Sequence, residues 1–178
     1  TYMICAPARG ATMSGRYPMR LGHYTDNTAE WDLHRAKLLP AVLKAGRGDL
    51  QWATHALGKW HVGWYYKNFT PTMRGFDTFF GSSGNTHDYW MHTLPGSSTH
   101  PRCGIAHTFP KDFIDAKGSQ LNLVDPSAFG KYDAELLSAR AMRIVSEHDL
   151  DKGLYVYLAF HNVHDPQMVP LASVERYT

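Results

Sequence analysis

The chain reads CAPARGATMSGR from Cys5 to Arg16. Pro7 suits the first turn of a helix, because its fixed φ is helical and its missing N–H is not needed there. We therefore predict a short helix that runs from Pro7 to about Met13 and ends near Gly15. This places Cys5 at the helix N-terminus, where free N–H groups and the helix dipole favour a bound anion.

The same stretch resembles the signature of the type I sulfatases, C-x-P-S-R-x-x-x-L-T-G-R. Cys5, Pro7 and Arg9 match its core, while Ala8 stands where the family usually has serine. In that family a modifying enzyme reads the C-x-P-x-R core and oxidises the cysteine to formylglycine. The resemblance therefore implies that Cys5 is the precursor of the catalytic group. One hydroxyl of the hydrated aldehyde would attack sulfur, and loss of sulfate would then restore the aldehyde.

Four further blocks resemble sulfatase sequences and follow in the family's order. They are GKWHVG at residues 58–63, RGFDTFFG at 74–81, HDYW at 87–90, and LYVYLAF at 154–160 followed by NVHDP at 162–166. The sequence of these blocks is most similar to that of the arylsulfatase B type, N-acetylgalactosamine-4-sulfatase. The resemblance implies an α/β fold with a mixed sheet flanked by helices, as in the alkaline-phosphatase-like superfamily.

The resemblance also implies a role for each of five side chains. Cys5, as formylglycine, would be the nucleophile, and Arg9 would stabilise its hydrate. Lys59 would hold a sulfate oxygen as a positive charge. His61 would take the proton in the step that resets the nucleophile, because an imidazole with a pKa of about 6.5 exchanges protons near neutral pH. His164 would bind the sulfate and assist the leaving oxygen.

Calcium is the cofactor that the resemblance implies, a hard ion that takes oxygen ligands. Modified Cys5 would be its ligand within this chain. The family's Asp-Asp pair before the cysteine has no match here, and neither have its later Asp, Asn or Gln, and Lys. We therefore expect residues 1–178 to be a partial sulfatase catalytic domain that is inactive in isolation.

The expected partners are a sulfate ester, either an aryl sulfate or a sulfated glycan, and a formylglycine-generating enzyme. The family implies a lysosomal or secreted location. The sequon Asn68-Phe69-Thr70 agrees with that location, although Pro71 directly after it disfavours glycosylation. Cys103 has no partner that the sequence assigns.

Composition argues against two other classes of protein. A formal net charge of +2, without a run of Lys and Arg, is not typical of a nucleic-acid binder. No apolar stretch approaches the ~18 residues of a membrane-spanning helix. His161 and His164 have the spacing of some metal-binding pairs, but the sequence shows no Cys or carboxylate at ligand spacing beside them, as a zinc signature would.

Hydrophobic periodicity predicts four regular elements beyond the first helix. These are a helix at residues 38–45, a strand at 51–57, a helix at 130–148 and a buried strand at 154–160. We expect loops at 17–36 and at 92–129, which have no steady period. Lys59 and His61 directly follow a strand, where ligands bind in open α/β sheets.

Two other functions are compatible with the same residues. The first is a sulfatase-like protein that binds sulfated glycans without cleaving them, which Ala8 and the unmatched metal ligands allow. The second is a phosphoryl-ester hydrolase of the same superfamily, which the arylsulfatase-like sequence around Lys59 and His164 disfavours. The leading hypothesis is a sulfuric ester hydrolase of the arylsulfatase type.

Overall fold

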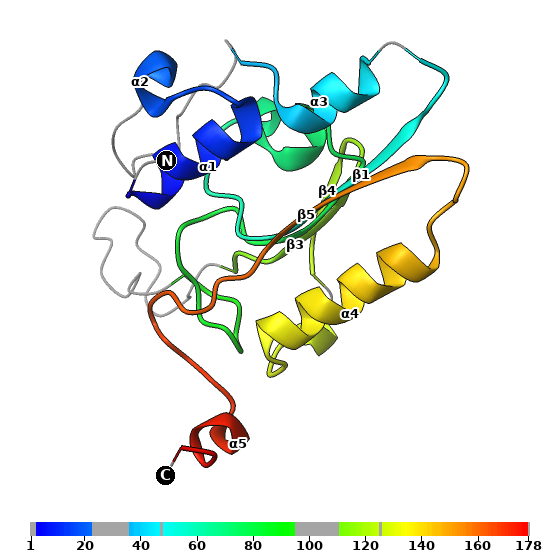
Figure 1. Cartoon of the computed structure of the whole chain (residues 1–178). Coiled ribbons are helices and arrows are strands. Elements are labelled where there is room, and N and C mark those ends of the chain that lie inside the picture. Colours follow the sequence, from blue (N-terminus) through cyan, green and yellow to red (C-terminus); the bar gives the residue numbers. More distant parts are fainter. Residues whose placement is uncertain (1–2, 23–35, 47, 95–110, 125, 178) are drawn as a thin grey trace.

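The computed structural model describes residues 3–22, 36–46, 48–94, 111–124 and 126–177 of the chain (Figure 1). Its helices are α1 (Cys5–Ser14), α2 (Pro18–Leu21), α3 (Leu39–Lys44), α4 (Asp133–Ser146) and α5 (Leu171–Val174). Its strands are β1 (Trp52–Gly58), β2 (Thr78–Gly81), β3 (Ile114–Lys117), β4 (Gln120–Leu123) and β5 (Gly153–Ala159). Short 3-10 turns are η2 (Lys67–Phe69), η3 (Pro71–Arg74) and η5 (Pro126–Ala128). Cys103 lies outside the described residues.

The five strands form one sheet in the order β4-β3-β2-β1-β5. β1 runs parallel to both β2 and β5, whereas β3 pairs antiparallel with β2 and with β4. Helices α1, α2 and α3 lie on one side of this sheet and α4 lies on the other (Figure 1). The expected α/β class, a mixed sheet flanked by helices, is confirmed.

A separate hydrophobic core fills each face of the sheet, because successive residues of a strand point to opposite faces. Ala56 and Phe79 join the core that includes Met13 of α1, Trp60 and Phe76. Their neighbours Leu57 and Phe80 join the other core, which includes Leu137 of α4. Both faces of the central strands are therefore covered, as is usual where strands are parallel.

Two glycines allow the ends of the central strands to come close together. A Cβ on Gly58 would lie 2.0 Å from the carbonyl oxygen of Ala159, and one on Gly81 would lie 2.1 Å from the carbonyl oxygen of Gly58. Both residues also have positive φ angles, 85° and 157°. Since glycine alone fits such a close backbone approach, these two residues bring the carboxyl ends of β1, β2 and β5 together.

Most of the predicted elements are confirmed. The first helix begins at Cys5, two residues before Pro7, and ends at Gly15, which has φ 67° and donates its N–H to the carbonyl of Ala11. The predicted helices at 38–45 and 130–148 correspond to α3 and α4. The predicted strand at 51–57 corresponds to β1.

The loop predicted at residues 92–129 is wrong in its second half. Residues 114–123 form the β3–β4 hairpin, with Gly118 at its turn in the left-handed region at φ 56°. β4 is exposed along its whole length, so it carries no alternation of polar and apolar residues that would reveal it. The loop predicted at 17–36 likewise contains α2, and residues 23–35 lie outside the described part of the chain.

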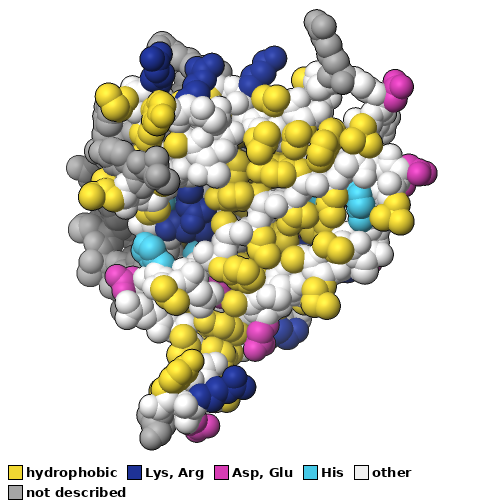
Figure 2. Space-filling model, in the orientation of Figure 1, with side chains coloured by type: hydrophobic (Ala, Val, Ile, Leu, Met, Phe, Trp, Pro, Cys, Tyr) yellow, Lys and Arg dark blue, Asp and Glu magenta, His cyan; other side chains and the backbone are white. Residues whose placement is uncertain are grey.

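The strand predicted at residues 154–160 exists as β5, but it is not fully buried. Its residues are half-buried or exposed, because β5 is the last strand in the described sheet order. Figure 2 shows hydrophobic side chains gathered over this strand on the face in view. Exposed Leu158 and Phe160 are among the apolar side chains of this segment.

Candidate active site

Three loops that follow parallel strands converge at one edge of the sheet. The backbone N–H of Lys59 donates to the carbonyl of Ala159 at the end of β5, over 2.8 Å. The next two N–H groups, of Trp60 and His61, donate to the carbonyls of Ser82 and Ser83 after β2, over 2.9 and 3.1 Å. The loops after β1, β2 and β5 are thus tied together where ligands usually bind in an α/β sheet.

Cys5 and Lys59 meet at one atom, the Oδ1 oxygen of Asn85. Lys59 Nζ lies 2.6 Å from this oxygen, and Cys5 Sγ lies 3.6 Å from it. Lys59 is only 2% exposed, so its ammonium group depends on such contacts for the solvation it has lost. The start of α1 and the ends of β1 and β2 therefore place a thiol, an amide and a buried positive charge within contact of one another.

Asn85 was not predicted from the sequence. It follows the block at residues 74–81 by a few positions, so it lies beyond the carboxyl end of β2. Asn85 could have been predicted from this position, because ligands bind beyond the carboxyl ends of strands in open α/β sheets. The same argument was used for Lys59 and His61, which follow β1.

Asp112 fixes the loop that carries Asn85. One carboxylate oxygen of Asp112 accepts from the N–H and the hydroxyl of Ser83, over 2.9 and 2.6 Å. The other accepts from the N–H of Gly84 over 2.8 Å. Three hydrogen bonds to a 6% exposed carboxylate give the Asn85 side chain a rigid support.

Arg9 joins helix α1 to the strand ends. Its Nη1 donates to the carbonyl of Lys59 over 2.7 Å and to the hydroxyl of Tyr157 over 2.9 Å. Burial raises the pKa of Tyr157, and the charge and hydrogen bond of Arg9 oppose that rise only in part, so the phenol stays protonated. These contacts make Arg9 a link that holds the start of α1, and hence Cys5, next to Lys59.

His61 is buried beside a cleft of about 410 Å³. The cleft is also lined by Trp64, Asn85, Lys111 and Asp112. The His61 backbone has φ 53°, which is uncommon for a residue other than glycine. Such backbone conformations cluster at functional sites, where the surrounding structure holds them in place.

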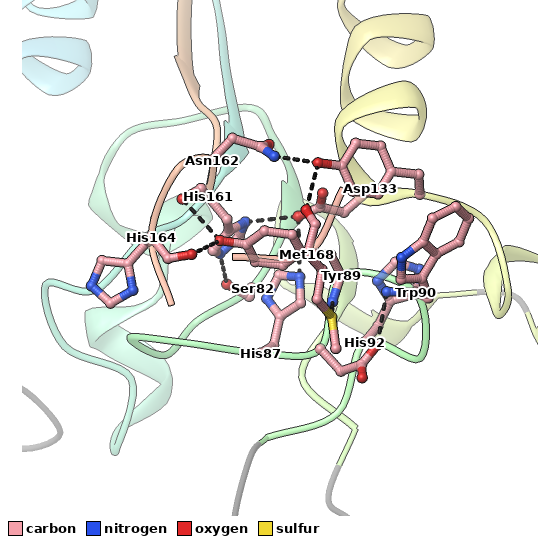
Figure 3. Close-up of polar contacts among 12 residues, drawn as sticks. Ser82, His87, Tyr89, Trp90, His92, Asp133, His161, Asn162, His164 and Met168 are labelled. Carbon is pink, nitrogen blue, oxygen red and sulfur yellow. Dashed lines mark hydrogen bonds and ion pairs between the residues drawn. The ribbon is translucent and has the colours of Figure 1, made fainter. Parts of the chain in front are cut away.

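His164 lies in the loop after β5 and is half-buried. Its Nδ1 is 3.0 Å from the carbonyl oxygen of Asp165, and its own carbonyl accepts a hydrogen bond from the Tyr89 hydroxyl over 2.6 Å. Figure 3 shows the His164 ring pointing away from His161, whose ring lies in the interior. The two histidines therefore do not form the metal-binding pair that their spacing could suggest.

The structure thus brings the five predicted residues to the same end of the sheet in two ways. Cys5 and Lys59 both contact Asn85, and Arg9 donates a hydrogen bond to the carbonyl of Lys59. His61 and His164 are placed by the loops that follow β1 and β5.

The model of the sulfatase family, described as "Sulfatase", matches residues 1–178. The chain belongs to the sulfatase family. Mouse (Mus musculus) arylsulfatase J is 30% identical over 174 residues, which cover 98% of this chain and 27% of that protein. N-acetylgalactosamine-6-sulfatase of Sus scrofa is 37% identical over 134 residues, which cover 67% of this chain and 24% of that protein.

Solved structures support the fold of this sulfatase-family chain. The crystal structure of Ps i-CgsB superposes with a TM-score of 0.76 at 24% identity, over 99% of this chain and 38% of that one. The PsFucS1 sulfatase from Pseudoalteromonas sp. superposes with a TM-score of 0.67 at 20% identity, over 93% of this chain and 35% of that one. The chain therefore spans between 24% and 38% of the length of these relatives.

No described helix of this sulfatase-family chain is long and apolar enough to cross a membrane. Calcium takes about six to eight oxygen ligands. One oxygen that contacts Cys5 Sγ is the neutral amide oxygen of Asn85, which also faces the Lys59 ammonium.

Proposed function

We propose that this chain carries the nucleophile and the sulfate-binding groups of a sulfuric ester hydrolase of the arylsulfatase type. The observation that carries the proposal is the meeting of Cys5 and buried Lys59 at Asn85 Oδ1. A nucleophile for a sulfate ester must lie beside a positive charge, because negative charge on the sulfate oxygens has to be stabilised during attack. Membership of the sulfatase family supports the same chemistry.

In this proposal Cys5 is converted to formylglycine, and its hydrated aldehyde attacks sulfur with release of the alcohol. Lys59 holds a sulfate oxygen, and its burial strengthens that interaction because little water screens it. His61 removes the proton from the second hydroxyl, so that the C–O bond to sulfate breaks and the aldehyde returns. His164 binds the sulfate from the loop after β5. Arg9 keeps the start of α1 against Lys59.

The proposed substrates are aryl sulfates or sulfated glycans. The similarity to N-acetylgalactosamine-6-sulfatase, whose name specifies a sulfated sugar, supports the glycan class. A lysosomal or secreted location and glycosylation at Asn68, which is exposed, belong to the same proposal. Calcium is implied by the family resemblance, and ligands beyond the described residues would be needed to hold it.

Mass spectrometry of the Cys5 peptide tests the first step. We expect formylglycine after co-expression with a formylglycine-generating enzyme, and none in Arg9→Ala, which removes a residue of the recognition core. An unmodified thiol in the parent chain under those conditions would contradict the proposal and favour a sulfated-glycan-binding protein.

Binding of inorganic sulfate and phosphate, measured by NMR titration, tests the second step. We expect sulfate to bind with an affinity that Lys59→Ala lowers about tenfold or more, since a charged hydrogen bond contributes ~1.5–3 kcal/mol. Equal loss in Lys37→Ala, which removes a lysine outside the site, would contradict it. Tighter binding of sulfate than of phosphate in the same titration favours the sulfatase over the phosphoryl hydrolase. Binding is the readout because the isolated chain is expected to turn over neither ester.

A further inference from the structure

A second cluster of chemistry-bearing side chains lies in the interior, apart from Cys5 and Lys59. His87 comes from the loop after β2, Asp133 from the first turn of α4, and His161 from the loop after β5 (Figure 3). The three side chains are 0%, 0% and 1% exposed. Two imidazoles and a carboxylate from distant parts of the chain therefore meet in the buried interior.

One carboxylate oxygen of Asp133 lies between the two histidines. Its Oδ2 is 3.2 Å from His87 Nε2 and 3.1 Å from His161 Nδ1. Neither ring nitrogen is aligned for a hydrogen bond to this carboxylate, and both Asp133 oxygens lack a hydrogen-bond partner among the described residues. A buried polar atom without a partner costs roughly 1–3 kcal/mol, and more when it is charged. A cation bound between these atoms would remove that cost.

The second nitrogen of His161 is already engaged. Its Nε2 lies 2.7 Å from the hydroxyl oxygen of Ser82, which is itself buried. When Nε2 carries the proton and donates it to Ser82, Nδ1 presents a lone pair toward Asp133. A histidine that binds a metal usually donates its other N–H in this way, which fixes the ring and directs the free nitrogen at the metal.

We propose that His87, Asp133 and His161 bind a divalent transition metal, with zinc as the best fit. Their ligand atoms all lie within 4.8 Å of one another. Bonds of about 2.0–2.1 Å in a tetrahedral site separate adjacent ligand atoms by ~3.3 Å. The observed separations of 3.1 and 3.2 Å match this edge within the tolerance for a metal site. A water molecule would complete the tetrahedron.

The donor set selects the kind of metal. Imidazole nitrogens with one carboxylate suit zinc and its neighbours, whereas calcium prefers oxygen ligands alone.

A metal at this position would act on structure. It would tie the start of α4 to the loops after β2 and β5. The loop after β2 carries Asn85, and the loop after β5 carries His164. The Tyr89 hydroxyl connects the cluster to that second loop, since it lies 3.2 Å from the carbonyl of His161 and 2.6 Å from that of His164. The metal would thus hold His164 in place without touching the substrate.

Metal binding by the whole chain tests this proposal. The purified chain is stripped with a chelator and titrated with zinc against a chromophoric competitor. We expect about one zinc per chain in the parent and in His148→Asn, a matched change of a histidine outside the cluster. Asp133→Asn and His161→Asn are expected to bind at least ~100-fold more weakly, and Ser82→Ala about tenfold more weakly.

Cobalt substitution of the parent chain provides a second readout that does not depend on variants folding. Tetrahedral Co²⁺ with nitrogen and oxygen ligands has intense visible absorption, which we expect the stripped chain to develop on addition of one equivalent. Zinc should also raise the thermal midpoint of the stripped chain. Failure of the parent chain to take up zinc or cobalt would overturn the proposal, as would uptake that Asp133→Asn leaves unchanged.

Discussion

Lys59 Nζ lies 2.6 Å from Asn85 Oδ1, although the two residues follow different strands. The amide oxygen is therefore directed at the positive charge, and Cys5 Sγ approaches the same oxygen from α1. A neutral acceptor at this point holds the lysine in place without cancelling its charge. This balance leads to a specific prediction about the amide.

Replacement of Asn85 by aspartate should weaken sulfate binding more than replacement by alanine. Asn85→Ala removes the group that positions Lys59, and we expect a loss of about threefold to tenfold. Asn85→Asp adds a negative charge beside the anion site and pairs with Lys59, so we expect a loss of more than ~tenfold. Sulfate titration by NMR measures both, with exposed Asn122→Asp as the control. Tighter binding in Asn85→Asp would show that the sulfate does not bind at Lys59.

Ala8→Ser should raise the fraction of Cys5 that becomes formylglycine. Ala8 is half-buried on α1 and stands where the sulfatase signature has serine. A serine there restores the recognition sequence while removing no contact of the folded chain. Quantitative mass spectrometry after co-expression with the modifying enzyme measures the fraction, and Ala11→Ser on the same helix serves as the control. Equal yields in the parent and Ala8→Ser would show that serine is unnecessary here.

Asp112→Ala should loosen the loop that carries Asn85. The change removes the acceptor for three hydrogen bonds and leaves the buried N–H of Gly84 without that partner. We expect the free energy of unfolding to fall by roughly 1–3 kcal/mol, measured by urea denaturation. Exposed Asp151→Asn should change it by less than ~0.5 kcal/mol. Unchanged stability in Asp112→Ala would mean that water replaces the carboxylate.

Asp77 should stabilise the fold at neutral pH but not in acid. Burial alone would raise the pKa of this carboxyl, but its hydrogen bonds with Lys44 and Thr54 outweigh burial, so the folded pKa lies below the ordinary 3.8. Unfolding then takes up protons as the pH falls below about 4. The stabilisation that Asp77 gives is therefore present above the ordinary pKa and is lost as the pH falls through the pKa of the folded state. Because Asp77 is 45% exposed, solvent screening limits it to about 1 kcal/mol or less.

The test is the difference in unfolding free energy between the parent and Asp77→Asn across pH. We expect a measurable difference at about pH 7 that shrinks as the pH falls below the ordinary pKa and through the lowered pKa of the folded state. Exposed Asp49→Asn should show no comparable trend. A difference that grows as the pH falls would refute this assignment, because the sign would then be opposite to that of a carboxyl with a lowered pKa.

Helices and strands were predictable where a single residue type or a regular spacing of apolar residues determines the local conformation. Pro7 lies in the first turn of α1 and Gly15 ends it, and the apolar stripe within residues 130–148 predicts the helix that is found as α4. The β3–β4 hairpin was missed, because fully exposed β4 has no hydrophobic period and only Gly118 marks its turn. The exposure of β5 was also unpredictable, since burial depends on which strands lie beside it.

The sequence by itself determined the family, the helix that begins at Cys5, and the chemical identity of Lys59, His61 and His164, because these lie in contiguous blocks. Tertiary structure alone decided that Asn85 joins Cys5 to Lys59. It also decided that His87 and Asp133 meet His161. In the sequence, His161 has the spacing of a metal-binding pair with His164 instead. The physical reason is that these contacts join residues far apart in the chain, and only the pairing of β2, β1 and β5 and the packing of α4 bring them within a few ångströms.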